Sequence, residues 1–206
     1  GILYGMPDVW EMYVRRVRSV LDELLQPPGT PYHERHYEAR VDAIAALIGA
    51  DGMEDHELWG SWGDHQTPPE GVQNLKDGHL TPRRQFLYVD LPESGGGPLP
   101  AEQAPDVMLD IAVLYPSFDA PEHAYLVLEN PLDVAVDISG WRLVGDVQIT
   151  FRAGTVVPSG GQLYVTPSMK AFRERPSPPT GGMGLFVVGD WAGALSTSPE
   201  LELVPV

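Results

Sequence analysis

HAYLVLENPLDVAVDISGWRLVGD, residues 123–146, is the stretch that decides the fold. Residues 125–129 have the alternation of a strand, and Asn130-Pro131 ends that strand with turn residues. A second short strand follows, and Ser139-Gly140 closes it just before Trp141. Short strands separated by turns at this spacing are typical of a β-sandwich. The stretch therefore predicts a structural module and does not by itself indicate a reaction.

The same pattern continues through the second half of the chain. Strands are predicted over residues 107–114, 124–129, 134–138, 141–144, 148–152, 162–166, 185–188 and 201–204. Seven or eight short strands in about 100 residues are the signature of an immunoglobulin-like sandwich. We expect Trp141 to be buried between its two sheets.

The first 90 residues have the spacing of helices instead. Apolar residues recur at steps of three and four, which predicts four helices, over residues 8–24, 32–48, 54–59 and 70–88. Asp8 suits the start of the first helix, and Gly49 is predicted to cap the second. In the second helix we expect Tyr37, Val41, Ile44 and Ile48 to share one face, and in the fourth we expect Val72, Leu75, Leu80 and Leu87 to point inward. Pro82 must start a new turn or kink the fourth helix.

The stretch between the two halves has the composition of a linker. Residues 91–105, LPESGGGPLPAEQAP, combine Gly, Pro and Ser without periodicity. The predicted fold class is therefore segregated α+β. It comprises a helical segment over 1–90, a linker over 91–106 and an all-β immunoglobulin-like sandwich over 107–206.

Composition excludes several classes of function. The formal net charge of −16 opposes binding to phosphate backbones, so we expect no nucleic-acid partner. No apolar run approaches the roughly 18 residues that a membrane helix needs, so we expect no membrane insertion. The absence of cysteine excludes disulfides, thiolate zinc sites and cysteine nucleophiles. No signal peptide is visible, and Gly1 in place of methionine suggests a fragment of a longer protein.

The chain carries no recognisable catalytic motif. A kinase needs a lysine on a strand beside a Gly-rich loop, and neither Lys76 nor Lys170 has that context. GGMG at 181–184 lacks the strand–helix setting of a phosphate-binding loop and is predicted to be a turn. We expect no catalytic residue, no cofactor and no metal ion, and therefore no enzyme activity in this chain.

Two groups of side chains resemble metal ligands by residue type alone. His33 and His36 lie three positions apart, and zinc would need further ligands from His56, His65, His79, Asp55 or Asp64. Asp133, Asp137 and Asp146 lie near sandwich turns, where carboxylates sometimes bind calcium, but they lack the spacing of a calcium loop. Both groups are expected to be ordinary exposed polar residues or caps.

Aromatic and basic residues in the helical half admit two interpretations. Trp59 and Trp62 could stack on a sugar or a partner, or could pack within the protein, which we favour. The arginines Arg15, Arg16, Arg18, Arg83 and Arg84 could be solvated or could contact a missing body of the parent protein. We instead expect them to pair with Asp22, Glu23 or Asp42.

Residues 107–206 resemble the lamin tail domain, an immunoglobulin-like module of nuclear lamins and of many bacterial surface and secreted proteins. The matching motifs occur in family order: LENP (128–131), VDISGW (136–141), ITFRAGTVVPSGG (149–161), LYV (163–165) and GDWAGALS (189–196). Ser198-Pro199-Glu200 departs from the glycine-containing turn that the family more often has, so we expect a local change in the last hairpin.

Residues 1–90 are similar to the C-terminal helical end of proteins like spore coat protein H (CotH-like). The similar pieces are YVRRVR (13–18), LDELLQPP (21–28), VDAI (41–44) and RRQFLY (83–88). This resemblance implies an atypical kinase fold whose nucleotide-binding and catalytic segments lie upstream and are not in this chain.

Together these patterns predict a non-catalytic structural or interaction module, for adhesion, docking or scaffolding, in a bacterial exported or envelope-associated protein. Its partner is expected to be a protein or a cell-surface component. Two alternatives remain open. The chain may form the accessory C-terminal part of a CotH-like kinase, or the sandwich may bind carbohydrate or calcium.

Overall fold

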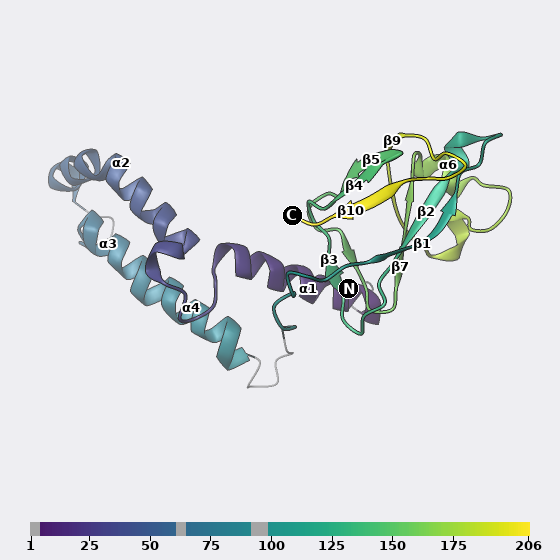
Figure 1. Ribbon diagram of the computed structural model, residues 1–206. Coiled ribbons are helices and arrows are strands. Elements are labelled where there is room, and N and C mark those ends of the chain that lie inside the picture. The colour runs from purple at the N-terminus through teal and green to yellow at the C-terminus, as the bar shows by residue number, and fades with distance from the viewer. Residues whose placement is uncertain (1–4, 61–64, 92–98) are drawn as a thin grey trace. The chain divides into compact units, whose positions relative to one another are not determined.

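The computed structural model describes residues 5–60, 65–91 and 99–206, and it confirms the segregated α+β class (Figure 1). Helices occupy the chain up to residue 91, and a region rich in β-strands follows. By its internal contacts the chain divides into two compact units. One unit, which we call the sheet unit, comprises Gly1–Arg16 and Gln103–Val206, and the other, the helical unit, comprises Val17–Glu102. We had expected residues 1–90 to form one segment, whereas the start of the first helix groups with the sheets.

The helices of the chain are longer than their sequence patterns indicate. Their bounds are α1 (Pro7–Leu24), η2 (Tyr32–Glu34), α2 (His36–Trp59), α3 (Pro68–Asn74), η3 (Leu75–Leu80), α4 (Thr81–Gln85) and η4 (Phe86–Asp90). The predicted cap at Gly49 is wrong, because α2 continues through it and ends only at Gly60, whose φ is 67°. A helical glycine costs only about 1 kcal/mol relative to alanine, and the alanines around Gly49 favour the helix. The second and third predicted helices are therefore one.

The last helical stretch begins at a capping box that the sequence pattern missed. The Glu70 carboxylate accepts the backbone N–H of Thr67 at 2.8 Å, and the Thr67 hydroxyl accepts the backbone N–H of Glu70 at 3.5 Å. This arrangement starts α3 at Pro68, two residues before the predicted start. The helical turns of η3 and η4 are π-helical. Pro82 lies near the start of α4, where it removes a backbone donor and the preceding turn widens.

Within the described residues, the strands form two four-stranded sheets and one small two-stranded sheet. Their bounds are β1 (Asp110–Tyr115), β2 (Tyr125–Glu129), β3 (Val136–Asp137), β4 (Arg142–Gly145), β5 (Val147–Thr150), β6 (Val156–Val157), β7 (Gln162–Thr166), β8 (Phe186–Gly189), β9 (Ala192–Gly193) and β10 (Leu201–Val204). The orders are β1-β2-β7-β8, β10-β4-β5-β9 and β3-β6. The pair β7–β8 is parallel, and the other strand pairs of the described residues are antiparallel. Each predicted strand range overlaps a strand, whereas β6, β9 and the short helix α6 (Met169–Arg173) were not predicted.

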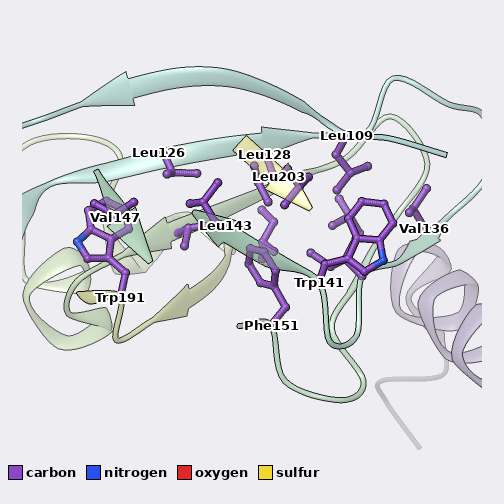
Figure 2. Packing of buried hydrophobic residues seen from close by; sticks show 14 of the residues in the cluster. Leu109, Leu126, Leu128, Val136, Trp141, Leu143, Val147, Phe151, Trp191 and Leu203 are labelled. Atoms are coloured by element: carbon purple, nitrogen blue, oxygen red, sulfur yellow. The ribbon is translucent and has the colours of Figure 1, made fainter. Parts of the chain in front are cut away.

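Both large sheets contribute side chains to one hydrophobic core. Leu126 and Leu128 come from β2, and Leu143 comes from β4. Trp141 is 5% exposed, which confirms that it anchors the core. Figure 2 shows Trp141 and Trp191 toward opposite ends of this cluster, with Phe151 between them. Two sheets around a shared core are the architecture of a β-sandwich.

Residues at the middle of α1 bind to the small sheet of the same unit and to the residue before it. The Arg15 guanidinium donates to the carbonyl of Ala135 at 2.9 Å, and the Arg16 guanidinium lies 3.1 Å from the Asp137 carboxylate. The Gln103 side chain exchanges two hydrogen bonds with the backbone of Asp137, at 2.8 and 2.9 Å. These polar contacts explain why residues on either side of the helical unit group with the sheets.

The Asn130 side chain ties together the loops at one end of the sandwich. It is fully buried, and its amide nitrogen donates to the carbonyls of Val134 at 2.8 Å and Pro158 at 2.9 Å. Its amide oxygen accepts the backbone N–H of Leu132 at 3.1 Å. A single side chain therefore satisfies backbone groups from two loops that are distant in sequence.

Among the described residues, no helix is both long and apolar enough to cross a membrane.

Replacing Asn130 with alanine should lower the free energy of unfolding by about 3 kcal/mol, because buried carbonyls lose their donor. Urea denaturation followed by tryptophan fluorescence measures this change. Asp133→Ala, at an exposed position of the same loop, is the matched control and should change stability by less than about 0.5 kcal/mol. Equal losses in the two variants would contradict the role of Asn130.

Candidate functional site

The helical unit is held together by a buried ion pair. The Arg84 guanidinium donates to both carboxylate oxygens of Glu38, at 2.8 and 3.0 Å, and both side chains are at most 2% exposed. Its Nε also donates to the carbonyls of Leu25 at 2.9 Å and Gln26 at 3.0 Å, which follow α1. Arg84, in α4, therefore fastens the end of α1 to the first turn of α2.

Two further polar clusters join the helices of this unit. Asp42 accepts hydrogen bonds from the Lys76 ammonium and, at 2.6 Å, from the Tyr32 hydroxyl. The hydrogen bond from Lys76 is the main reason that the pKa of Asp42 lies below its usual value and that the pKa of Lys76 lies above its own. Together with the Arg84–Glu38 pair, these contacts connect α2 to the helices that follow it.

In the second cluster, the Tyr88 hydroxyl donates to Asp22 at 2.9 Å, and burial and this carboxylate raise the pKa of Tyr88. Arg18 pairs with the same carboxylate at 2.8 Å and lies over the Tyr88 ring. The predicted pairing of Arg18 with Asp22 is confirmed. The cluster connects α1 to η4.

Few apolar side chains of the helical unit are buried. Among its described residues, the buried hydrophobic side chains are Leu25 and Leu80, and the one buried residue of the 24-residue helix α2 is Glu38. The large apolar residues that remain exposed are Tyr32, Tyr37, Ile44, Leu47, Ile48, Leu58, Trp59, Leu75 and Phe86. Leu75 was predicted to point inward and is instead 42% exposed, so that prediction is wrong. The described part of this unit therefore carries apolar faces that it does not cover.

Two apolar hollows lie on these faces. One, of about 460 Å³, is lined by residues of α1, α2 and the later helices, including Leu24, Val41 and Leu87. The other, of about 350 Å³, lies between α2 and α3 and is lined by residues such as Ile48 and Val72. Neither lining contains the combination of nucleophile and base that covalent catalysis needs, whereas both could accept apolar side chains of another molecule.

The candidate zinc ligands are not brought together. His33 lies beside Glu34 at 3.3 Å, and His36 contacts the ring of Tyr37. No group of three or more histidine, aspartate or glutamate side chains in the described ranges could hold a metal ion. Asp64 lies outside those ranges.

The candidate calcium ligands already serve the turns of the sandwich. Asp137 accepts hydrogen bonds from the backbone N–H and hydroxyl of Ser139, at 2.9 and 2.5 Å. Asp146 accepts the backbone N–H of Ser196 at 2.8 Å, and its hydrogen bonding with Ser196 lowers its pKa. Asp133 is exposed. Asp137 and Asp146 therefore act as turn caps. GGMG likewise contributes the single 3₁₀ turn η6 (Gly181–Met183), which precedes β8.

The candidate tryptophans and arginines lie in different environments. Trp59, which we expected to pack within the protein, is 79% exposed, so that interpretation is wrong, and Trp62 lies outside the described residues. Arg83 lies over the Phe86 ring at 5.6 Å. The acids that pair with Arg16 and Arg84 are Asp137 and Glu38, neither of which sequence reasoning had assigned to them.

An aromatic cluster on the sheet unit was missed altogether. The rings of Tyr115 and Tyr125 are stacked with their centroids 5.1 Å apart, and the Arg175 guanidinium lies beside this pair, 4.7 and 4.8 Å from the two centroids. It also donates to the carbonyl of His123. Phe172 of α6 packs against Tyr125 and Tyr164. The cluster fastens α6 and the following loop to the outer face of the sheet. The only sequence signal was a tyrosine on each of three strands.

Replacing Arg84 with methionine should lower the free energy of unfolding of the helical unit by about 3–5 kcal/mol, because it leaves the Glu38 carboxylate buried without its main partner. Urea denaturation followed by far-ultraviolet circular dichroism measures the loss. Arg83→Met, at the neighbouring exposed position, should have little effect. If the two variants unfold at the same urea concentration, Arg84 does not hold the unit together.

No protein-family model matches the chain, and no curated protein matches it.

Proposed function

We propose that this chain is a non-catalytic docking module in which the helical unit binds a protein partner through its exposed apolar faces. The sheet unit, with its closed hydrophobic core, serves as the structural part. The observation that carries the proposal is α2, a 24-residue helix whose one buried residue is the charged Glu38.

The physical argument rests on the cost of exposed apolar surface. Each large apolar side chain left in water forgoes about 1.5–3 kcal/mol of stabilisation relative to full burial. Scattered exposed leucines are ordinary, but contiguous apolar patches on a helix usually mark interaction sites. Leu47, Leu58 and Trp59 are each more than two-thirds exposed and lie on the same helix.

The second candidate is the accessory end of a CotH-like kinase. The same exposed faces support it, because helices that complete a larger domain also lack a core of their own. The two candidates differ in whether the partner surface belongs to another protein or to an upstream part of the same polypeptide. The resemblance to bacterial lamin tail domains supports an exported or envelope-associated setting in both.

Site-specific photo-crosslinking tests the proposal in cells that produce the protein. A photoreactive residue at Leu47 or Leu58 should yield a discrete cross-linked protein that mass spectrometry can identify, because those side chains lie at the docking face. The same residue at exposed Glu202 of β10 is the matched control and should yield no such product.

Equal cross-linking at helical and control positions would contradict docking through α2. Hydrolysis of ATP by the purified protein would contradict its non-catalytic nature. Cross-links to an upstream segment of the same polypeptide would favour the second candidate.

A further inference from the structure

The outer surface of α2 has the spacing of a coiled-coil seam. Ile44, Ile48, Asp51, Asp55 and Leu58 follow one another at steps of four, three, four and three residues, which places them along one stripe of the helix. The apolar side chains on and beside this stripe, Ile44, Leu47, Ile48, Leu58 and Trp59, are between 43% and 83% exposed. We call these seven residues the α2 seam.

The centre of the α2 seam is acidic. Asp51 and Asp55 are exposed, and they separate the apolar residues of the first half of the seam from Leu58 and Trp59. The order along the helix is therefore apolar, acidic, apolar. A partner helix that covered the whole seam would have to face two carboxylates at its middle.

A second copy of this chain does not suit the seam. Two copies of α2 paired about the centre of the seam, in either orientation, bring these carboxylates against one another. Like charges at such positions destabilise pairing, and burying carboxylates without counter-ions costs more. The net charge of −16 also opposes the approach of two copies.

We propose that the α2 seam binds one amphipathic helix of a protein partner whose apolar residues flank a central pair of lysine or arginine side chains. The proposal deepens the docking function above and rests on it. Burial of the apolar residues at the two ends of the α2 seam favours binding. The charge pairs at its centre fix the position of the partner helix along α2 and exclude acidic partners. This division of roles explains why two aspartates interrupt an otherwise apolar stripe.

Two synthetic helical peptides test the charge pattern of the partner. Both carry leucines in their outer heptads, and they differ only in the central heptad, which holds two lysines in one peptide and two glutamates in the other. Isothermal titration of the intact protein should show the lysine peptide binding at least about tenfold more tightly than the glutamate peptide. Leu47→Ser combined with Leu58→Ser should weaken both.

Charge reversal on the protein supplies the decisive comparison. Asp51→Lys combined with Asp55→Lys should invert the preference, so that the glutamate peptide binds more tightly. Glu57→Lys combined with Glu202→Lys makes the same change of net charge at exposed positions outside the α2 seam and should leave the preference for lysine intact. An equal effect of the two double variants would overturn the proposal, because it would reduce the preference to net charge. Failure of the lysine peptide to bind the unaltered protein would overturn it too.

A second measurement needs no peptide. Asp51→Leu combined with Asp55→Leu makes the α2 seam continuously apolar, and sedimentation should then show self-association that Glu57→Leu, at an exposed position outside the seam, does not cause. Self-association of the unaltered protein would instead make a second copy the occupant and overturn the proposal. A cross-link from Leu47 to residues 103–206 of the same chain would overturn it as well. Discrete cross-links to another protein, without a charge preference among the peptides, would support the docking function. They would contradict only the proposal that the partner is a basic helix.

Discussion

The helical unit depends on the hydrogen bonds that the Arg84 guanidinium donates. It reaches from α4 to the carbonyls of Leu25 and Gln26 and to the carboxylate of Glu38, on either side of the connection between α1 and α2. A planar group with five donors can hold several acceptors in fixed directions, which an ammonium cannot do. These hydrogen bonds join α1 and α2 where α1 ends and α2 begins. Because they hold the two helices together there, the sides of the helices do not have to pack on one another. Several of their apolar residues thereby remain exposed.

The two units are thus stabilised by different kinds of interaction. The sheet unit buries leucines, valines, tryptophans and a phenylalanine between its sheets, and its buried Asn130 satisfies backbone groups from two loops. Burial of that kind stabilises a fold without help from a partner. The helical unit gains little from apolar burial within its described residues, and ion pairs with good geometry mainly specify an arrangement. We infer that its full stability is reached only when its apolar faces are covered.

The strands were predictable from sequence because their signals are local. Period-two alternation and turn residues such as Asn130-Pro131 act within a few positions, and Trp141 could be assigned to the core from its place after a turn. Two-residue strands such as β6 and β9 carry too short a pattern to be seen. The capping box at Thr67 and Glu70 was visible in the sequence, although the prediction did not use it.

The candidate site could not be predicted in the same way. Helical periodicity identifies which face of a helix is apolar, but not what covers that face, so Trp59 of α2 and Leu75 of η3 were wrongly expected to be packed. Glu38 and Arg84 are 46 residues apart, and no local pattern links them. Asp51 and Asp55 interrupt the apolar stripe of α2. This interruption can be interpreted as a binding feature only once the structure shows that the stripe is exposed.

Amide hydrogen exchange of the free protein tests the central claim most directly. If the helical unit lacks a covered core, the amides of α2 open by local fluctuations and should exchange at least about a hundredfold faster than those of β2 and β7, despite regular helical hydrogen bonds. Protection of α2 equal to that of the two core strands would contradict the account, because it would show that the helical unit is stable without a partner.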